Sequence, residues 1–199
     1  MPEPQPLAHA TLPTRFGDFR VQVFRVPPAL AESLVLLHGT LRPDEPALVR
    51  LHSECLTGDV LGSLRCDCGQ QLSASLDLIG QAGAGVLLYL RQEGRGIGLV
   101  NKIRAYALQD TGMDTVDANL ALGLPVDGRE YASAATILRQ LGISRVRLLT
   151  NNPLKTLALE QNGIEVVERV PLVVPPNPSN LDYLRTKASR MGHVLRVEG

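Results

Sequence analysis

The alternation of helical and strand patterns in the middle of this chain restricts its fold more than any other feature. Leu72, Leu76 and Ile79 recur at helical spacing and form one apolar face. The short apolar runs 86–90 and 146–149 are bounded by turns and are typical of buried strands. Repeated strand, loop and helix segments favour an α/β fold in which helices flank a mixed sheet.

The first part of the chain favours strands. Phe19, Val21 and Val23 alternate with polar neighbours, which predicts a half-buried strand around them. The segments 33–37 and 47–52 have a similar strand-like composition. The sheet is therefore expected to begin in a β-rich N-terminal part.

Further elements are expected towards the C-terminus. Leu99, Ile103 and Tyr106 share one face of a predicted helix after Gly98. A strand is predicted over 164–167. Other helices are predicted over 131–141, from the cap Asn152 with Pro153 at the first position to Gly163, and over 181–191.

The length of 199 residues fits a single domain, for which about 100–200 residues are usual. We expect residues 11–199 to form that domain and the proline-rich residues 1–10 to be a flexible segment. The start lacks the charged and apolar parts of a signal peptide, and no segment approaches the roughly 20 apolar residues of a membrane helix. These features predict a cytoplasmic protein.

The charges of the chain balance, with 20 Lys and Arg against 20 Asp and Glu. This balance argues against the general basic field of a nucleic-acid or membrane binder, so an anionic ligand must be met by local groups. Arginine greatly outnumbers lysine, which occurs only at Lys102, Lys155 and Lys187. The planar guanidinium suits bidentate phosphate contacts, although genomic base composition explains the excess about equally well.

The three cysteines, Cys55, Cys66 and Cys68, lie close together in the sequence. Their odd number leaves one thiol outside any intramolecular disulfide, which favours reduced thiolates. Three sulfur ligands suit Zn²⁺, and an open fourth position is typical of a catalytic zinc site. His52 is the candidate for a fourth ligand, which would give a closed structural site instead. Inert buried cysteines are the remaining alternative.

One predicted strand–helix junction has features of a phosphate-binding loop. Gly94, Gly96 and Gly98 allow a close approach of the backbone to a ligand, and Arg91 and Arg95 supply positive charge. The glycine spacing is neither a Walker loop nor a dinucleotide fingerprint, so it is a weak signal alone.

Two further segments carry polar groups at helix starts. Lys155 lies in the first turn of a predicted helix whose free N–H groups favour anions. An ordinary capped helix explains the rest of the segment 150–155. The charged segment 127–131, taken alone, is explained by a solvated turn before a helix.

A thiolate zinc site combined with phosphate-binding loops indicates hydrolysis of a nucleotide at an electrophilic carbon. Three thiolates over-neutralise Zn²⁺, so a water bound to it is less acidic than with neutral imidazole ligands. A nearby general base is therefore expected, and Glu54 and Glu93 are candidates. The segment 52–54 echoes the first motif of the zinc nucleobase deaminases. Their second motif is missing, because 66–68 has one residue between its cysteines and lacks the preceding proline.

Longer motifs resemble those of one enzyme family. They are Arg-Leu-His-Ser-Glu-Cys-Leu-Thr-Gly-Asp at 50–59, Gly-Ser-Leu-Arg-Cys-Asp-Cys-Gly at 62–69 and Arg-Gln-Glu-Gly-Arg-Gly-Ile-Gly at 91–98, with further matches at 11–17, 101–107, 148–153, 186–187 and 191–193. In this order they resemble GTP cyclohydrolase II of riboflavin biosynthesis over nearly the whole chain. The length favours the free-standing form, without the dihydroxybutanone phosphate synthase domain of some members.

The resemblance implies a ligand set for zinc and a set of substrate contacts. Cys55, Cys66 and Cys68 match the zinc ligands, which implies an open site with His52 as a neighbour. The positions that match GTP contacts are Arg50, Leu51, His52, Ser53, Glu54, Gln71, Glu93, Gly94, Arg95, Thr115, Thr150 and Lys155. Gln70 stands beside Gln71, which leaves open which amide reads the guanine edge.

Three further positions match catalytic residues of the family. Asp127 matches a proposed proton acceptor, Arg129 a proposed nucleophile, and Tyr106 a tyrosine implicated in ring opening. A guanidinium stays protonated and has no free lone pair, so a charge clamp on the triphosphate is the more economical role for Arg129. Asp127 would then orient or deprotonate Arg129 or a water. For Tyr106 the alternative is packing beside Leu99 and Ile103.

The implied reaction converts GTP to formate, pyrophosphate and 2,5-diamino-6-(5-phosphoribosylamino)pyrimidin-4(3H)-one. Zinc-activated water would open the guanine imidazole at C8, a second attack would free formate, and Mg²⁺ is expected on the triphosphate. The implied assembly is a homodimer with a small-molecule substrate and no nucleic-acid or membrane partner. The alternatives are a deaminase-like zinc enzyme acting on another base, a homologue stopping at a formamidopyrimidine nucleotide, and a non-catalytic nucleotide-binding regulator with zinc closed by His52.

Overall fold

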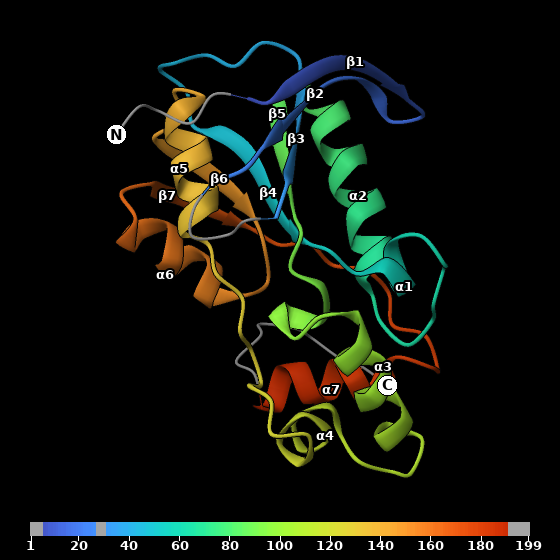
Figure 1. Cartoon of the computed structure of the whole chain (residues 1–199). Helices are drawn as coiled ribbons and strands as arrows, with labels where there is room; N and C mark the ends of the chain where they lie inside the picture. Colours follow the sequence, from blue (N-terminus) through green and yellow to red (C-terminus); the bar gives the residue numbers. More distant parts are fainter. Residues whose placement is uncertain (1–5, 27–30, 191–199) are drawn as a thin grey trace. The chain divides into compact units, whose positions relative to one another are not determined.

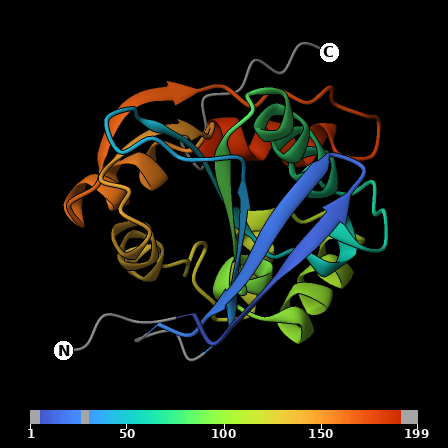
Figure 2. The same cartoon turned by 90° about the horizontal axis from the view of Figure 1, so that it is seen from above.

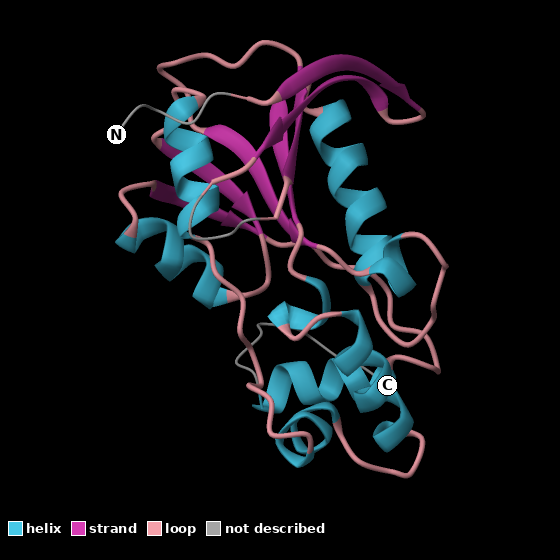
Figure 3. Cartoon of the chain, in the orientation of Figure 1, coloured by secondary structure: helices cyan, strands magenta, loops and turns pink. Residues whose placement is uncertain are grey.

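The computed structural model describes residues 6–26 and 31–190 (Figure 1). Its strands and helices alternate along much of the chain (Figure 3). The strands are β1 (Ala8–Thr14), β2 (Gly17–Phe24), β3 (Ser33–His38), β4 (Ala47–Ser53), β5 (Gly85–Leu90), β6 (Arg145–Leu149) and β7 (Glu165–Val170). The helices are α1 (Leu56–Asp59), α2 (Cys68–Gln81), the 3-10 helix η1 (Glu93–Gly96), α3 (Leu99–Gln109), α4 (Thr115–Ala121), α5 (Ala132–Gln140), α6 (Pro153–Gln161) and α7 (Leu181–Arg190). None of these helices is long and apolar enough to cross a membrane.

The strands form one sheet in the order β1-β2-β3-β5-β4-β6-β7. Neighbours among β1, β2, β3 and β5 are antiparallel, whereas β6 is parallel to both β4 and β7. The predicted mixed sheet and β-rich N-terminal part are therefore confirmed. Sequence patterns did not indicate β1, because this edge strand has almost no buried residue and hence no apolar alternation.

The chain divides into two compact units. Unit 1 comprises residues 1–52, 73–91 and 131–172, and unit 2 comprises residues 53–72, 92–130 and 173–199. Unit 1 holds the sheet, α5, α6 and most of α2, and unit 2 holds α1, η1, α3, α4 and α7. One domain over 11–199 stays a prediction.

The structure covers only part of the predictions made for the two ends of the chain. Of the expected flexible segment 1–10, residues 1–5 lie outside the described residues, and Ala8–Ala10 already belong to β1. The matched motif at 191–193 also lies outside the described residues.

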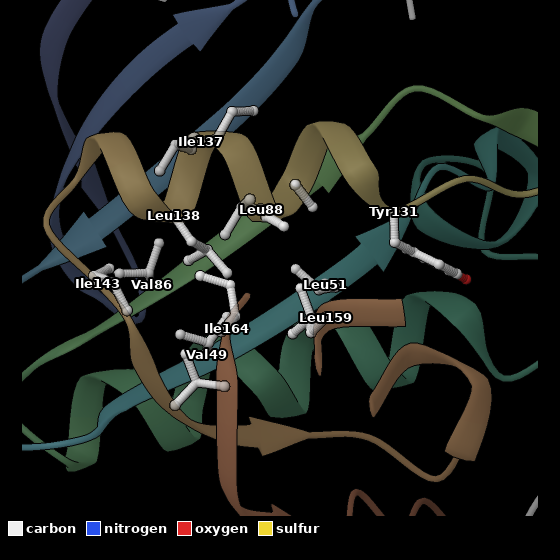
Figure 4. Close-up of a cluster of buried hydrophobic side chains, with 14 of the residues drawn as sticks. Val49, Leu51, Val86, Leu88, Tyr131, Ile137, Leu138, Ile143, Leu159 and Ile164 are labelled. Carbon is white, nitrogen blue, oxygen red and sulfur yellow. The ribbon is translucent and has the colours of Figure 1, made fainter. Parts of the chain in front are cut away.

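Helices cover both faces of the sheet in unit 1, with α5 and α6 on one face and α2 on the other (Figure 2). Val86 and Leu88 of β5 point into a cluster with Ile137 and Leu138 of α5 (Figure 4). The intervening Leu87 is also buried, at 1% exposure, as expected for a strand covered on both faces. Each such side chain contributes about 1.5–3 kcal/mol of burial free energy, so this cluster dominates the stability of unit 1.

The predicted apolar face of α3 is wrong. Leu99 and Ile103 are 39% and 48% exposed, whereas Lys102 and Ala105 are buried. The buried face of α3 instead carries Lys102, whose polar partners in unit 2 cannot be inferred from apolar periodicity. The other predicted helices and strands are confirmed to within a few residues, and Asn152 caps α6 by accepting from the Leu154 N–H at 3.0 Å.

Candidate metal centre and substrate-binding groups

The three thiols form one group in unit 2. Cys55 precedes α1, Cys66 lies in the following turn, and Cys68 begins α2. Their Sγ atoms all lie within 4.8 Å of one another, with 3.7 Å between Cys55 and Cys66. Tetrahedral zinc with Zn–S bonds of about 2.3 Å requires sulfurs about 3.8 Å apart, whereas a disulfide needs about 2.05 Å. The group therefore fits a zinc ion.

Two glycines make room for this group. A Cβ atom at Gly58 would lie 2.8 Å from the Sγ of Cys66 and 3.2 Å from that of Cys55. A Cβ atom at Gly69 would lie 2.2 Å from the main-chain oxygen of Gly58. These approaches are too close for any side chain, so α1 and the start of α2 bring the thiols together only with glycine at both positions.

Cys55 is held by three neighbours. Its N–H donates to Asp59 Oδ2 at 3.0 Å, and its Sγ accepts from Lys102 Nζ at 3.0 Å. Thr57 Oγ1 lies 3.7 Å from the same sulfur. These contacts fix the direction in which the thiol points.

The thiols differ in acidity. Hydrogen bonds from Cys66 and Cys68, followed by that from Lys102, hold the pKa of Cys55 well below its usual range. The hydrogen bond to Cys55 raises the pKa of Cys66 to about 11, and the pKa of Cys68 is raised for the same reason. A metal ion binding here displaces the protons of Cys66 and Cys68.

Glu93 links the thiol group to the loop 92–98. Its carboxylate accepts from the N–H groups of Leu56 at 2.6 Å and Gly94 at 2.7 Å, and from Lys102 Nζ at 2.8 Å. The side chains of Glu93 and Lys102 are 10% and 9% exposed. Burial alone would lower the pKa of Lys102, but hydrogen bonds to Glu93 and Cys55 outweigh it and raise the pKa above its usual range. Lys102 is therefore cationic.

The same loop reaches the segment 127–130. Gly94 and Arg95 adopt left-handed backbone angles, with φ of 62° and 61°, and Arg95 is the one non-glycine residue with positive φ in the described part of the chain. For Arg95 this conformation costs about 1–3 kcal/mol, and such strained residues are concentrated at functional sites. The Arg95 carbonyl accepts from the Gly128 N–H at 3.0 Å, and a Cβ at Gly96 would lie 2.8 Å from the Gly128 oxygen.

Asp127 and Arg129 form a two-pronged ion pair. Arg129 Nε donates to Asp127 Oδ1 at 2.8 Å, and Nη2 donates to Oδ2. Burial tends to raise the pKa of Asp127, but hydrogen bonds from Arg129 outweigh it and the pKa lies below its usual range. The side chains are 10% exposed for Arg129 and 23% for Asp127, whereas Gly128 and Glu130 are exposed, so a solvated turn describes only part of this segment. The carboxylate fixes the plane of the guanidinium.

Tyr106 lies beside the thiol group rather than on a buried apolar face. Its hydroxyl is 3.5 Å from Thr57 Oγ1, and its ring is approached by the cations of Arg65 at 5.0 Å and Lys102 at 5.7 Å. Burial raises the pKa of Tyr106 to about 12, although the hydrogen bond with Thr57 acts in the opposite direction. The phenol therefore stays protonated at neutral pH.

Two of the remaining expected contacts of unit 2, Gln71 and Ser53, are positioned by local hydrogen bonds. Gln71 donates to the buried Asp67, whereas Gln70 is exposed. Ser53 Oγ accepts from Gln92 Nε2 at 3.0 Å, and Thr115 is the first residue of α4. Glu54 is half-buried.

Unit 1 holds a second group at the carboxyl ends of two parallel strands. Arg50 donates to the Leu149 carbonyl at 2.9 Å, and Lys155 Nζ donates to the Leu51 carbonyl at 2.8 Å. Thr150 Oγ1 accepts from the N–H of Asn152 at 3.0 Å. The carboxyl ends of parallel strands are where open α/β sheets bind ligands.

His52 also belongs to unit 1. The residue is 2% exposed, and its ring stacks on that of Tyr89, with the ring centroids 5.4 Å apart.

Sequence reasoning missed four residues of unit 2 that carry its contacts. They are Thr57, Gly58, Gln92 and Lys102. All four stand inside the matched motifs, which is a signal of importance, but sequence spacing does not indicate which atoms meet.

Comparison with known proteins gives one family model and several relatives that agree with each other. The family model for GTP cyclohydrolase II matches residues 5–171. A GTP cyclohydrolase-2 of Acinetobacter baumannii (strain SDF) is 57% identical over 193 residues, 96% of each chain. One of Histophilus somni (strain 2336) is 55% identical over 191 residues, 96% of this chain and 88% of its relative. A two-domain 3,4-dihydroxy-2-butanone 4-phosphate synthase from A. baumannii aligns with a TM-score of 0.48 and 19% identity over 87% of this chain and 41% of that one.

Proposed function

Because this chain belongs to the GTP cyclohydrolase II family, we propose that it hydrolyses GTP to formate, pyrophosphate and 2,5-diamino-6-(5-phosphoribosylamino)pyrimidin-4(3H)-one. This reaction is the first committed step of riboflavin biosynthesis. The observation that carries the proposal is the grouping of Cys55, Cys66 and Cys68 around Gly58, in the same unit as the Asp127–Arg129 pair. The loop 92–98 contacts both groups.

The three thiols would hold Zn²⁺, which when bound supplies Lewis-acid activation of water for attack on C8 of guanine. One water opens the imidazole ring, another cleaves the resulting formamide to release formate, and a third separates the α- and β-phosphates. Tyr106 would donate a proton to a departing ring nitrogen, because its hydroxyl lies 3.5 Å from Thr57 Oγ1, which is itself 3.7 Å from the Cys55 sulfur.

Arg129 would act as a charge clamp on the triphosphate. Its guanidinium is permanently charged, and its ion pair with Asp127 holds the fork in one plane before substrate arrives. Pre-oriented charge of this kind stabilises the departing pyrophosphate at no reorganisation cost. Mg²⁺ would share that task on the phosphate oxygens.

The proposed GTP contacts occur in both units. Those in unit 1 are Arg50, Leu51, His52, Thr150 and Lys155, and those in unit 2 are Ser53, Glu54, Gln71, Glu93, Gly94, Arg95 and Thr115. Cationic groups suit the triphosphate, and amide and carboxylate groups suit the guanine edge. Glu93 already receives three hydrogen bonds, which suits a positioning role better than that of a general base.

We further propose that the protein is a cytoplasmic homodimer that binds GTP and neither nucleic acid nor membranes. Light scattering of the purified protein tests the dimer, and cell fractionation tests the compartment. A monomer with full activity would contradict the proposed assembly.

The deciding experiment assays formate and pyrophosphate together after the metal-replete protein is incubated with GTP and Mg²⁺. Both products should appear, and Cys66→Ser should release neither while still binding GTP. Pyrophosphate without formate indicates a product that retains the formamide. Ammonia indicates deamination, and GTP binding without turnover indicates a regulator; each of these outcomes contradicts the proposal.

A further inference from the structure

Lys102 is a buried cation placed between a carboxylate and a thiol. Its Nζ lies 2.8 Å from Glu93 Oε1 and 3.0 Å from Cys55 Sγ. A buried ammonium group is stable only with such partners, because its desolvation costs several kcal/mol. The position is thus specified by the chemistry of its neighbours rather than by the apolar periodicity of α3.

The backbone around Lys102 fixes this geometry. Its N–H donates to the Gly98 carbonyl at 3.0 Å in the first turn of α3. A Cβ atom at Gly94 would lie 3.2 Å from the Cβ of Lys102, so the loop 92–98 packs directly on the lysine stem. Glu93 is itself held by the N–H groups of Leu56 and Gly94. The ammonium group is therefore held in place rather than free to swing away.

Charge gives this arrangement a consequence for the metal. Zn²⁺ with three thiolates carries a net negative charge, which weakens its attraction for the electrons of a bound water. A hydrogen bond from a cation withdraws electron density from a thiolate and thereby offsets part of this effect. Lys102 provides such a bond to Cys55.

We propose that Lys102 is a positioning residue of the metal centre, whose ammonium group orients the Cys55 thiolate and so maintains metal affinity, and compensates the charge of that thiolate and so maintains the electrophilicity of the metal. This inference rests on the proposed zinc function. It adds to that function a residue outside the ligands, the substrate contacts and the catalytic positions implied by the family resemblance.

The test compares metal binding by the wild-type protein with that of Lys102→Met and Lys102→Arg. Methionine keeps an unbranched stem and removes the charge, whereas arginine keeps the charge. Arg104→Met is the matched control, because it removes an exposed cation from the same helix. Zn²⁺ affinity is measured against a competing chelator, and the thiolate-to-cobalt charge-transfer bands are recorded after Co²⁺ loading.

We expect Lys102→Met to lose about 10–100-fold in metal affinity, as for other residues that contact metal ligands. Its charge-transfer bands should move to lower energy, because an uncompensated thiolate gives up its electrons more easily. Lys102→Arg should recover most of the affinity, and Arg104→Met should match the wild type. Wild-type affinity and unchanged bands in Lys102→Met would overturn the inference.

Two further comparisons keep the outcome decisive. If Lys102→Met does not fold, Lys102→Gln retains a donor without charge and should bind metal less tightly than Lys102→Arg; equal affinities would overturn the inference. If the wild-type protein binds neither Zn²⁺ nor Co²⁺, the proposed zinc function fails, which is distinct from a metal-binding protein that is indifferent to residue 102.

Discussion

The two units of this chain are built by different forces. The whole apolar core cluster, including Leu88, Ile137 and Leu138, lies in unit 1 between the sheet and its helices. In unit 2 the contacts around the thiols are ionic or polar, and Asp67 and Lys102 are among its buried residues. A unit with few buried apolar side chains gains its stability from specific partners, so unit 2 should depend on the proposed metal far more than unit 1 does.

The largest effect should come from removing the metal. Zinc bound to thiolates contributes an apparent free energy of about 10–16 kcal/mol in zinc-finger peptides at neutral pH. Chelation, or Cys66→Ser, should abolish turnover and increase amide hydrogen exchange locally in α1 and α3, without unfolding the chain, so that GTP binding survives. Exchange in β5 and α5 should change little. An equal loss of protection from hydrogen exchange in both units would contradict the proposed difference in their dependence on the metal.

Truncation of the apolar core should destabilise unit 1 and leave metal binding in unit 2 unchanged. Leu138→Ala, at a fully buried position of α5, should lower the free energy of unfolding by about 2–5 kcal/mol in urea titrations. Leu157→Ala, at a site 49% exposed, is the control and should cost less than about 0.5 kcal/mol. The zinc content of the folded Leu138→Ala protein should equal that of the wild type. Loss of zinc from this variant would show that the stabilities of the two units are coupled.

The ion pair of unit 2 should affect catalysis rather than folding. Arg129→Gln should lower kcat about 10²–10³-fold, the usual cost of removing a donor that stabilises transition-state charge. Asp127→Asn should cost less, because the guanidinium remains but is no longer held by two charged contacts. Arg147→Gln removes an exposed ion pair with Glu168 and should change kcat less than twofold.

Trapping of a covalent nucleotide on Arg129 in a reaction quenched with denaturant at alkaline pH, where a P–N bond survives, would contradict the clamp. It would also favour the alternative in which this residue is a nucleophile.

Tyr106→Phe should give the smallest change in stability at neutral pH. The ring keeps its contacts with Arg65 and Lys102, while formate release should slow by about 10²-fold through loss of the proton donor. Unchanged turnover would favour a packing role.

The pH dependence of stability provides a second measurement on the same variant. Because the folded-state pKa of Tyr106 is raised to about 12, its contribution to stability is fully present below the unfolded value near 10 and is lost as pH rises through about 12. The wild type should therefore lose stability relative to Tyr106→Phe across that window. Parallel pH curves for the two proteins would contradict the raised pKa.

Much of the fold was predictable because unit 1 obeys periodic rules. Buried strands such as β5 and the amphipathic α2 leave apolar patterns with periods that a sequence shows directly. The exposed β1 leaves no such pattern, and α1 has only four residues. In α3 the apolar pattern was misleading, because the buried face there is occupied by Lys102 and its charged partners.

The candidate site was predictable in kind but not in detail. The spacing of Cys55, Cys66 and Cys68 favoured zinc, and the longer motifs resembled one family. The contact of Lys102 with Cys55 joins residues 47 positions apart, and no local pattern encodes it. The sequence by itself determined the α/β architecture, the kinds of side chain available to a metal, and the family, because these follow from residue periodicity and identity. Only the tertiary structure decided which charges meet, because hydrogen bonds depend on distances between atoms that the chain brings together after folding.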